Sequence, residues 1–139
     1  MQEVETHAPD FTVLARDIKR WGEELGFQQI GISDCELGPA EERLRAWLAR
    51  GWHGDMDYMA AHGVKRSRPA ELIPGTVRII SARLNYIPAA GAAPHAVLED
   101  PTLAYLSRYA LGRDYHRVIR RRLQRLADRI TAAVGPFRY

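Results

Sequence analysis

The sequence predicts an α/β (α+β) fold in which a small mixed sheet is flanked by helices. Apolar residues recur with the period of an α-helix near both ends of the chain, and two short apolar runs between them are typical of strands. A chain of 139 residues is long enough for one domain with a core of its own. Because two strands do not complete a sheet, we expect this domain to be incomplete.

The first predicted helix covers residues 11–25. Asp10 is its expected N-cap, because a carboxylate at this position accepts hydrogen bonds from the free N–H groups of the first turn. Gly26 is the expected stop. The apolar residues recur at spacings of three and four and therefore share one face of the helix; they are Phe11, Leu14, Ile18, Trp21 and Leu25.

A short strand is predicted over residues 27–33. Its isoleucines alternate across Gly31, a glycine that we expect to mark a close approach by another segment. Residues 34–38 are predicted to form a turn.

A second helix is predicted to begin at Pro39, which suits a first helical turn. Glu41 and Glu42 are favourable there, because they lie near the positive end of the helix dipole. Gly51 is expected to end the helix.

The next segment is predicted to contain a short helix, capped by Asp55, reaching His62 and ending at Gly63. An alternative role follows from the close spacing of His53, Asp55 and Asp57, which could form a carboxylate–histidine acid–base pair. Capping by Asp55 is the preferred interpretation.

Residues 65–69 are basic and are predicted to connect this helix to the second strand. A solvated loop is the preferred interpretation; alternatively, Arg66 or Arg68 could bind a phosphate or carboxylate through bidentate donation. Residues 73–76 are predicted to form a turn.

The second strand is predicted over residues 77–86. Its nearly continuous apolar character indicates a central or well-covered strand. Residues 87–101 are rich in Ala, Pro and Gly and are predicted to form a loop, long enough to be functional. The last helix is predicted to begin after its cap Asp114 and to end at Gly135-Pro136; its apolar positions are Val118, Ile119, Leu123, Leu126, Ile130 and Val134.

The segment Ser107–His116 is the strongest candidate for a functional site. It gathers two arginines, two tyrosines, an aspartate and a histidine at a helix N-terminus, where free N–H groups favour an anion. Tyr109 and Tyr115 could stack on or hydrogen-bond to a large planar ligand. The alternative is a structural helix entrance, with Asp114 as cap and Gly112 in a left-handed turn.

The charge distribution offers a second candidate. The chain carries a net charge of +3, and seven arginines but only two aspartates fall between residues 113 and 129. This face could neutralise nucleic-acid phosphates, or it could be an ordinary solvated helix face.

The sequence contains no specific metal signal. Cys35 is the single cysteine and is predicted to be a small, at least partly buried residue, not a nucleophile. The chain has neither a membrane-length apolar run nor a signal-peptide core near its N-terminus, so we expect no membrane association and a cytoplasmic location.

Several motifs resemble the N-terminal region of the epoxyqueuosine reductase family, in its order and at its spacing across nearly the whole chain. They are Trp21-Gly22, Glu24–Phe27, Gly31–Ser33, His53–Met59, Arg66, Pro69, Leu72–Gly75 and Ser107–His116. The Arg-Tyr-Ala-x-Gly-x-Asp-Tyr-His pattern is specific to this family.

This resemblance implies an oxidoreductase of queuosine biosynthesis that reduces epoxyqueuosine to queuosine in tRNA. It implies a cobalamin-binding α/β domain followed by a domain with two [4Fe–4S] clusters, an external electron donor and a monomeric state. Residue by residue, it assigns Arg66, Arg108 and Tyr109 to cobalamin binding.

The chain departs from the family pattern in two respects. The family's proton-donor aspartate is expected beyond Tyr139, so residues 1–139 contain no catalytic residue of the family, and Cys35 matches none of its cluster cysteines. Residues 1–139 are therefore expected to be the N-terminal part of the reductase domain and to be inactive alone. The alternative is a small basic nucleic-acid-binding domain without catalysis.

Overall fold

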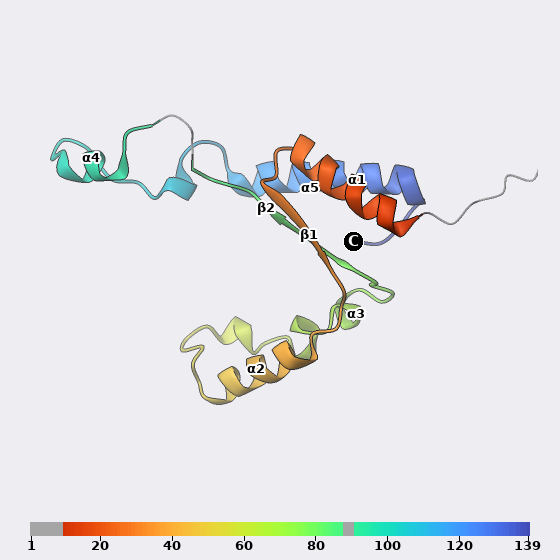
Figure 1. Cartoon of the computed structure of the whole chain (residues 1–139). Coiled ribbons are helices and arrows are strands. Elements are labelled where there is room, and N and C mark those ends of the chain that lie inside the picture. Colours follow the sequence, from red (N-terminus) through yellow and green to blue (C-terminus); the bar gives the residue numbers. More distant parts are fainter. Residues whose placement is uncertain (1–9, 88–90) are drawn as a thin grey trace, which may run out of the picture. The chain divides into compact units, whose positions relative to one another are not determined.

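A computed structural model describes residues 10–87 and 91–139 (Figure 1). The chain divides into two compact units: unit 1 comprises Met1–Ile30 with Ala82–Pro136, and unit 2 comprises Gly31–Ser81 with Phe137–Tyr139. The helices are α1 (Phe11–Glu24), α2 (Gly38–Ala49), α3 (Pro69–Leu72), α4 (Pro94–Glu99) and α5 (Tyr115–Val134). The strands are β1 (Gln29–Ser33) and β2 (Ile79–Arg83), and 3₁₀ turns occupy Asp57–Met59, Gly63–Arg66 and Arg108–Ala110.

The two strands pair in an antiparallel sheet, which with the helices confirms the predicted α/β class. Both strands are shorter than predicted. The expectation of a central, well-covered β2 is wrong, because β1 is its one partner within the described residues and four of its five residues are exposed.

Helix α1 begins and ends as predicted. The carboxylate of Asp10 accepts hydrogen bonds from the N–H groups of Thr12 and Val13, at 2.8 and 3.2 Å. At the other end Gly26 has a φ of +82°, and its N–H donates to the carbonyl of Glu23 at 2.8 Å. The N–H of Phe27 donates to the carbonyl of Gly22 at 3.0 Å, which completes a Schellman motif.

The core of unit 1 forms where α1 packs against α5 (Figure 1). Its buried apolar residues come from α1, the segment that leads into β1, and α5; they are Ile18, Phe27, Ile30, Leu126, Ala127 and Ile130. The predicted apolar faces therefore supply the core. Not every residue of these faces is buried, since Phe11 at the first residue of α1 is 71% exposed and Leu123 of α5 is 40% exposed.

The close approach predicted at Gly31 lies instead at Gly22. A methyl group at Gly31 would stand 4.0 Å from the Cβ of Ser81, which is an ordinary contact. A methyl group at Gly22 would stand 2.2 Å from the Cγ1 atom of Ile30. Gly22 thus allows the backbone of α1 to rest directly on the side chain of Ile30.

In unit 2, helix α2 confirms the prediction around Pro39, but the next segment does not form the predicted helix over 55–62. Two 3₁₀ turns replace it, because its hydrogen bonds join residues three apart, as from Ala60 N–H to the Asp57 carbonyl at 3.0 Å. Asp55 caps neither turn, and Gly63 begins the second turn where it was expected to end a helix.

The predicted connector and loop also contain regular structure. Pro69 begins α3, and only Ser67 and Arg68 separate it from the turn that includes Arg66. Within the predicted loop 87–101, of which residues 88–90 lie outside the described residues, α4 forms over Pro94–Glu99. Proline at the first helical position loses no intrahelical hydrogen bond, so the Pro and Ala content that suggested a loop is equally compatible with a helix here.

Candidate functional site

The candidate site Ser107–His116 lies in unit 1 and enters α5 through two tight turns. Arg108–Ala110 form a 3₁₀ turn, and Gly112 has a φ of +89°, in the left-handed region that favours glycine. The Asp114 carboxylate accepts a hydrogen bond from the His116 N–H at 3.0 Å and caps the helix as predicted. The segment therefore forms a structural helix entrance. A binding role would fall to the side chains that this turn and cap hold in place.

Arg108 anchors this segment to the chain before α4. Its Nη2 atom donates to the carbonyl of Ala92 at 2.5 Å. Beside it is a hollow of about 190 Å³ with a mainly apolar lining, made up of Gly91, Ala92, Val97, Ala104, Tyr105, Leu106, Arg108 and Leu111. Arg108 thus places a fixed cation at the edge of an apolar hollow.

The aromatic residues of the segment form a continuous cluster. The rings of Tyr109 and Tyr115 meet edge to face at 6.2 Å, and the Tyr115 ring stacks on that of His116 at 4.0 Å. The Nδ1 atom of His116 lies 3.1 Å from a carboxylate oxygen of Asp114. Tyr109 nevertheless remains 57% exposed, so its ring and hydroxyl group are open to a ligand.

Arg66 belongs to unit 2, whereas Arg108 and Tyr109 belong to unit 1, so the structure describes the two parts of the predicted site separately. Arg66 is exposed, and its Nη2 atom donates to the carbonyl of Tyr58. This bond ties together the two 3₁₀ turns and uses one of the five N–H donors of the guanidinium group.

A charge cluster around a buried carboxylate lies beside Arg66, and the sequence interpretation missed it. Glu41 of α2 is 7% exposed, and Arg68 donates to both of its carboxylate oxygens at 3.0 Å. Ser67 adds a hydrogen bond at 3.0 Å and Arg45 forms an ion pair. The bidentate donation considered for Arg68 therefore occurs, but within the chain. Lys65, Arg66 and Arg68 are exposed as the solvated interpretation expects, although the segment is folded into a 3₁₀ turn and the start of α3.

This cluster strongly stabilises the charged form of Glu41. Its pKa is lowered from 4.5 to about 2, first by the hydrogen bond from Arg68 and then by the one from Ser67. The same hydrogen bond raises the pKa of Arg68. The sequence interpretation assigned Glu41 only a favourable position at the positive end of a helix dipole. It missed the hydrogen bonds to Glu41 because the donors, Ser67 and Arg68, lie 26 and 27 residues further along the chain.

The basic face of α5 divides into two groups. Arg122 donates to the carbonyl of Gly26 at 2.9 Å, and Arg129 binds the carboxylate of Glu24 at 2.5 Å, which lowers the pKa of Glu24. These two arginines hold α1 against α5. The other five have exposed side chains; they are Arg113, Arg117, Arg120, Arg121 and Arg125.

The other residues considered as chemical groups occupy structural positions. The ring of His53 packs at 5.8 Å from that of Trp47, and no hydrogen bond joins it to Asp55 or Asp57. Cys35 is half-buried, with its Sγ atom 3.7 Å from the Thr76 carbonyl. In the described part of the chain, no group of three or more His, Cys, Asp and Glu side chains could hold a metal ion.

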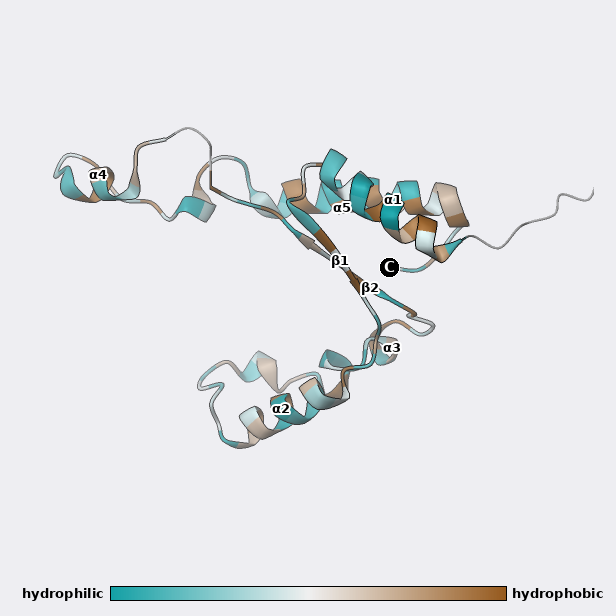
Figure 2. Cartoon of the chain, viewed as in Figure 1, coloured by the Kyte–Doolittle hydropathy of each residue, from teal (hydrophilic) through white to brown (hydrophobic). Residues whose placement is uncertain are grey.

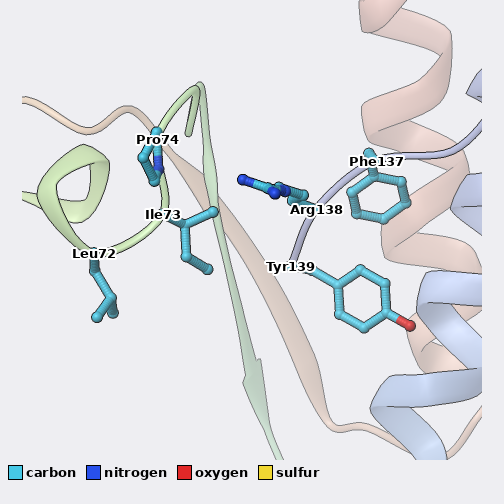
Figure 3. Close-up of a pocket in the computed structure, with 6 residues that line it drawn as sticks. All are labelled: Leu72, Ile73, Pro74, Phe137, Arg138 and Tyr139. Carbon is cyan, nitrogen blue, oxygen red and sulfur yellow. The ribbon is translucent and has the colours of Figure 1, made fainter.

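Unit 2 contains a second, wider hollow of about 420 Å³. Figure 3 shows one side formed by Leu72, Ile73 and Pro74 and the other by Phe137, Arg138 and Tyr139. Leu72 and Tyr139 are 66% and 67% exposed, so this hollow is an open surface feature.

Comparison with known proteins gives consistent matches. The family model described as Epoxyqueuosine reductase QueG, DUF1730 matches residues 66–139. Epoxyqueuosine reductase of Pseudomonas aeruginosa is 64% identical over 93% of this chain and 36% of its own length; that of Salmonella typhimurium is 53% identical over 94% and 34%. The Escherichia coli enzyme is 55% identical over 87% and 32%. No solved structure matches the chain significantly.

The matched proteins are reductases. The chain belongs to the epoxyqueuosine reductase family, which confirms the family predicted from its motifs. It spans about a third of the length of the curated relatives it matches.

Proposed function

We propose that the full-length protein reduces epoxyqueuosine to queuosine in tRNA, as an oxidoreductase of queuosine biosynthesis. The observation that carries this proposal is the 64% identity to the Pseudomonas aeruginosa epoxyqueuosine reductase over 93% of the chain. Identity at this level over most of the chain retains the local motifs as well as the fold.

Residues 1–139 are, in this proposal, the N-terminal part of the cobalamin-binding reductase domain. Two [4Fe–4S] clusters and the proton-donor aspartate would come from sequence outside residues 1–139. A cluster requires several cysteines, and this segment supplies Cys35 alone. We therefore expect residues 1–139 to have no reductase activity by themselves.

Arg66, Arg108 and Tyr109 are proposed to bind cobalamin, which would supply the low-valent metal for the reduction. Corrin carries amide side chains and a phosphate-containing tail, so cationic and phenolic donors suit it. The exposed Tyr109 and the apolar hollow beside Arg108 support this assignment on unit 1. Arg66, in unit 2, has N–H groups left for a ligand, because its bond to the Tyr58 carbonyl uses one of the five.

The remaining proposals concern the cellular setting. We propose a cytoplasmic monomer that receives electrons from an external donor. Within the described ranges, no helix has both the length and the apolar character needed to cross a membrane.

The proposed activity is tested with purified full-length protein, cobalamin, a low-potential reductant and tRNA that carries epoxyqueuosine. Nucleoside mass spectrometry should show queuosine replacing epoxyqueuosine, and no conversion with residues 1–139 alone. Intact epoxyqueuosine after incubation with the fully loaded protein would contradict the proposal.

The cofactor assignment is tested by cobalamin titration of the full-length protein, followed by visible absorbance. Tyr109→Phe removes one hydroxyl donor and Arg66→Ala removes a cation, so each should weaken binding, by about tenfold or more for the arginine. Arg108→Ala should act similarly, but it also removes the bond to Ala92 and is the less specific probe.

Matched controls for this titration are Tyr86→Phe and Arg43→Ala. Tyr86 is an exposed tyrosine of unit 1 outside the candidate segment, and Arg43 is an exposed arginine of α2 in unit 2, the unit that contains Arg66. Both controls should bind as the wild type does. Equal affinities for Tyr109→Phe, Arg66→Ala and the controls would remove the assignment while leaving the family function intact.

A further inference from the structure

The five exposed arginines of α5 and its entrance form one surface, here called the arginine surface: Arg113, Arg117, Arg120, Arg121 and Arg125. Arg117, Arg121 and Arg125 follow one another on α5 at intervals of four residues, or about 6 Å per step, and Arg113 directly precedes the cap Asp114. Arg117 precedes the buried Leu126 by nine residues, or two and a half helical turns, so the two lie on opposite sides of α5.

Acidic residues neutralise at most one of the five arginines of this surface. Asp114 caps the helix and lies 3.7 Å from Arg117, while Asp128 accepts a hydrogen bond from Gln124 at 2.9 Å. Within the described residues, no ion pair involves Arg113, Arg120, Arg121 or Arg125. This contrasts with Arg122 and Arg129, which bind the end of α1.

Like charges at intervals of four residues destabilise a helix. Within the described residues, the fold shows no compensating contact for Arg121 and Arg125. A ligand that carries several negative charges would reverse this cost, and guanidinium groups match phosphate through two parallel hydrogen bonds.

The composition of this face favours a nucleic acid over a protein partner. Most helix positions on the side away from the core are polar, with the exposed Ala132 as an exception, and much of α5 is hydrophilic in Figure 2; the polar positions include Arg117, Arg120, Arg121, Gln124, Arg125 and Asp128. Protein interfaces have an apolar centre depleted in charge, whereas contacts to a phosphate backbone are made mainly by cationic and polar groups.

We propose that the arginine surface binds the phosphate backbone of RNA. That the RNA is tRNA rests on the proposed function; the recognition of phosphate rests on the surface itself. Binding of this kind is independent of base sequence and weakens steeply with salt.

The test uses full-length protein and an unmodified tRNA transcript, with binding measured by fluorescence anisotropy over a range of salt concentrations. The variant Arg120→Gln/Arg121→Gln/Arg125→Gln removes three exposed cations that form no ion pair within the described residues. Glutamine and arginine have similar helix propensities, so the helix should be retained. The matched control Arg16→Gln/Lys19→Gln/Arg43→Gln removes three exposed helical cations outside the surface.

The surface variant should bind at least about tenfold more weakly, and the slope of log Kd against log salt should fall by about two to three, or about 0.7–0.9 per lost phosphate contact. The control should retain both values, and neither variant should melt at a lower temperature than the wild type. Equal affinity and slope for the two variants would overturn the proposal. So would unchanged tRNA binding combined with lost electron transfer from an acidic donor protein, since the surface would then be a protein-docking site.

The two proposals fail separately. Salt-dependent tRNA binding through the surface, in a protein that leaves epoxyqueuosine intact, would uphold the surface and contradict the proposed reductase. Conversion of epoxyqueuosine with full tRNA affinity in the surface variant would uphold the reductase and contradict the surface.

Discussion

Replacing Gly22 by alanine is expected to destabilise unit 1 by about 1–3 kcal/mol, the usual cost of overfilling a packed core. The added methyl group would lie 2.2 Å from Cγ1 and 2.7 Å from Cδ1 of Ile30. Ile30 is 6% exposed, and its branched side chain is stiff at χ1, so it has little room to move away. The overlap should outweigh the gain in helix propensity of about 1 kcal/mol.

Hydrogen exchange of the α1 amides in the full-length protein measures this effect, and it should accelerate about tenfold or more. The control is Gly38→Ala in α2, where nothing lies within 4 Å of the added methyl group; exchange should there be unchanged or slower. In an Ile30→Ala background the overlap is gone, so Gly22→Ala should cost much less than in the wild type. Additive effects of the two substitutions would show that this contact is not the cause.

Local sequence signals were sufficient where local interactions form the structure. The limits of α1 and α5 depend on Asp10, Asp114, Gly26 and Gly135, whose effects reach only a few residues along the chain. The apolar period then identified the faces that form the core of unit 1. The motif at 107–116 was likewise recognisable, because its capping residue and its glycine both act within the segment.

The failures occur where distant residues decide the conformation. A glycine in a helix does not reveal that Ile30 will pack on it, so the close approach was assigned to Gly31 and not to Gly22. Nor can spacing show which arginines of α5 face α1, because that depends on carbonyl and carboxylate partners 96 and 105 residues away. The assignment of Arg66, Arg108 and Tyr109 to cobalamin binding remains a prediction from the family motif. Arg66 belongs to unit 2 and the other two residues belong to unit 1, so the contacts within either unit do not test it.

Replacing Glu41 by glutamine is expected to loosen unit 2, because the charge cluster supplies the buried groups of that unit. Within its described residues, the buried side chains are those of Glu41 and Ser67, and every buried apolar side chain belongs to unit 1. Glutamine keeps the shape but turns an N–H donor group toward Arg68, leaving the guanidinium without its carboxylate. The amides of residues 63–73 should exchange about tenfold faster or more, whereas Glu42→Gln, at an exposed neighbouring position, should leave them unchanged.

Acid should reproduce the effect of this substitution in the wild type. The pKa of Glu41 is about 2 in the folded chain against an ordinary value of 4.5, so between these values the unfolded state binds more protons. The contribution of Glu41 to stability is therefore complete above pH 4.5 and is lost as the pH falls toward 2. Protection of residues 63–73 should decline across this window in the wild type and in Glu42→Gln, while Glu41→Gln should lack this component. An equal decline in all three proteins would show that another group controls the acid stability of unit 2. The charge cluster would then orient α2 but would not be the main source of the stability of unit 2.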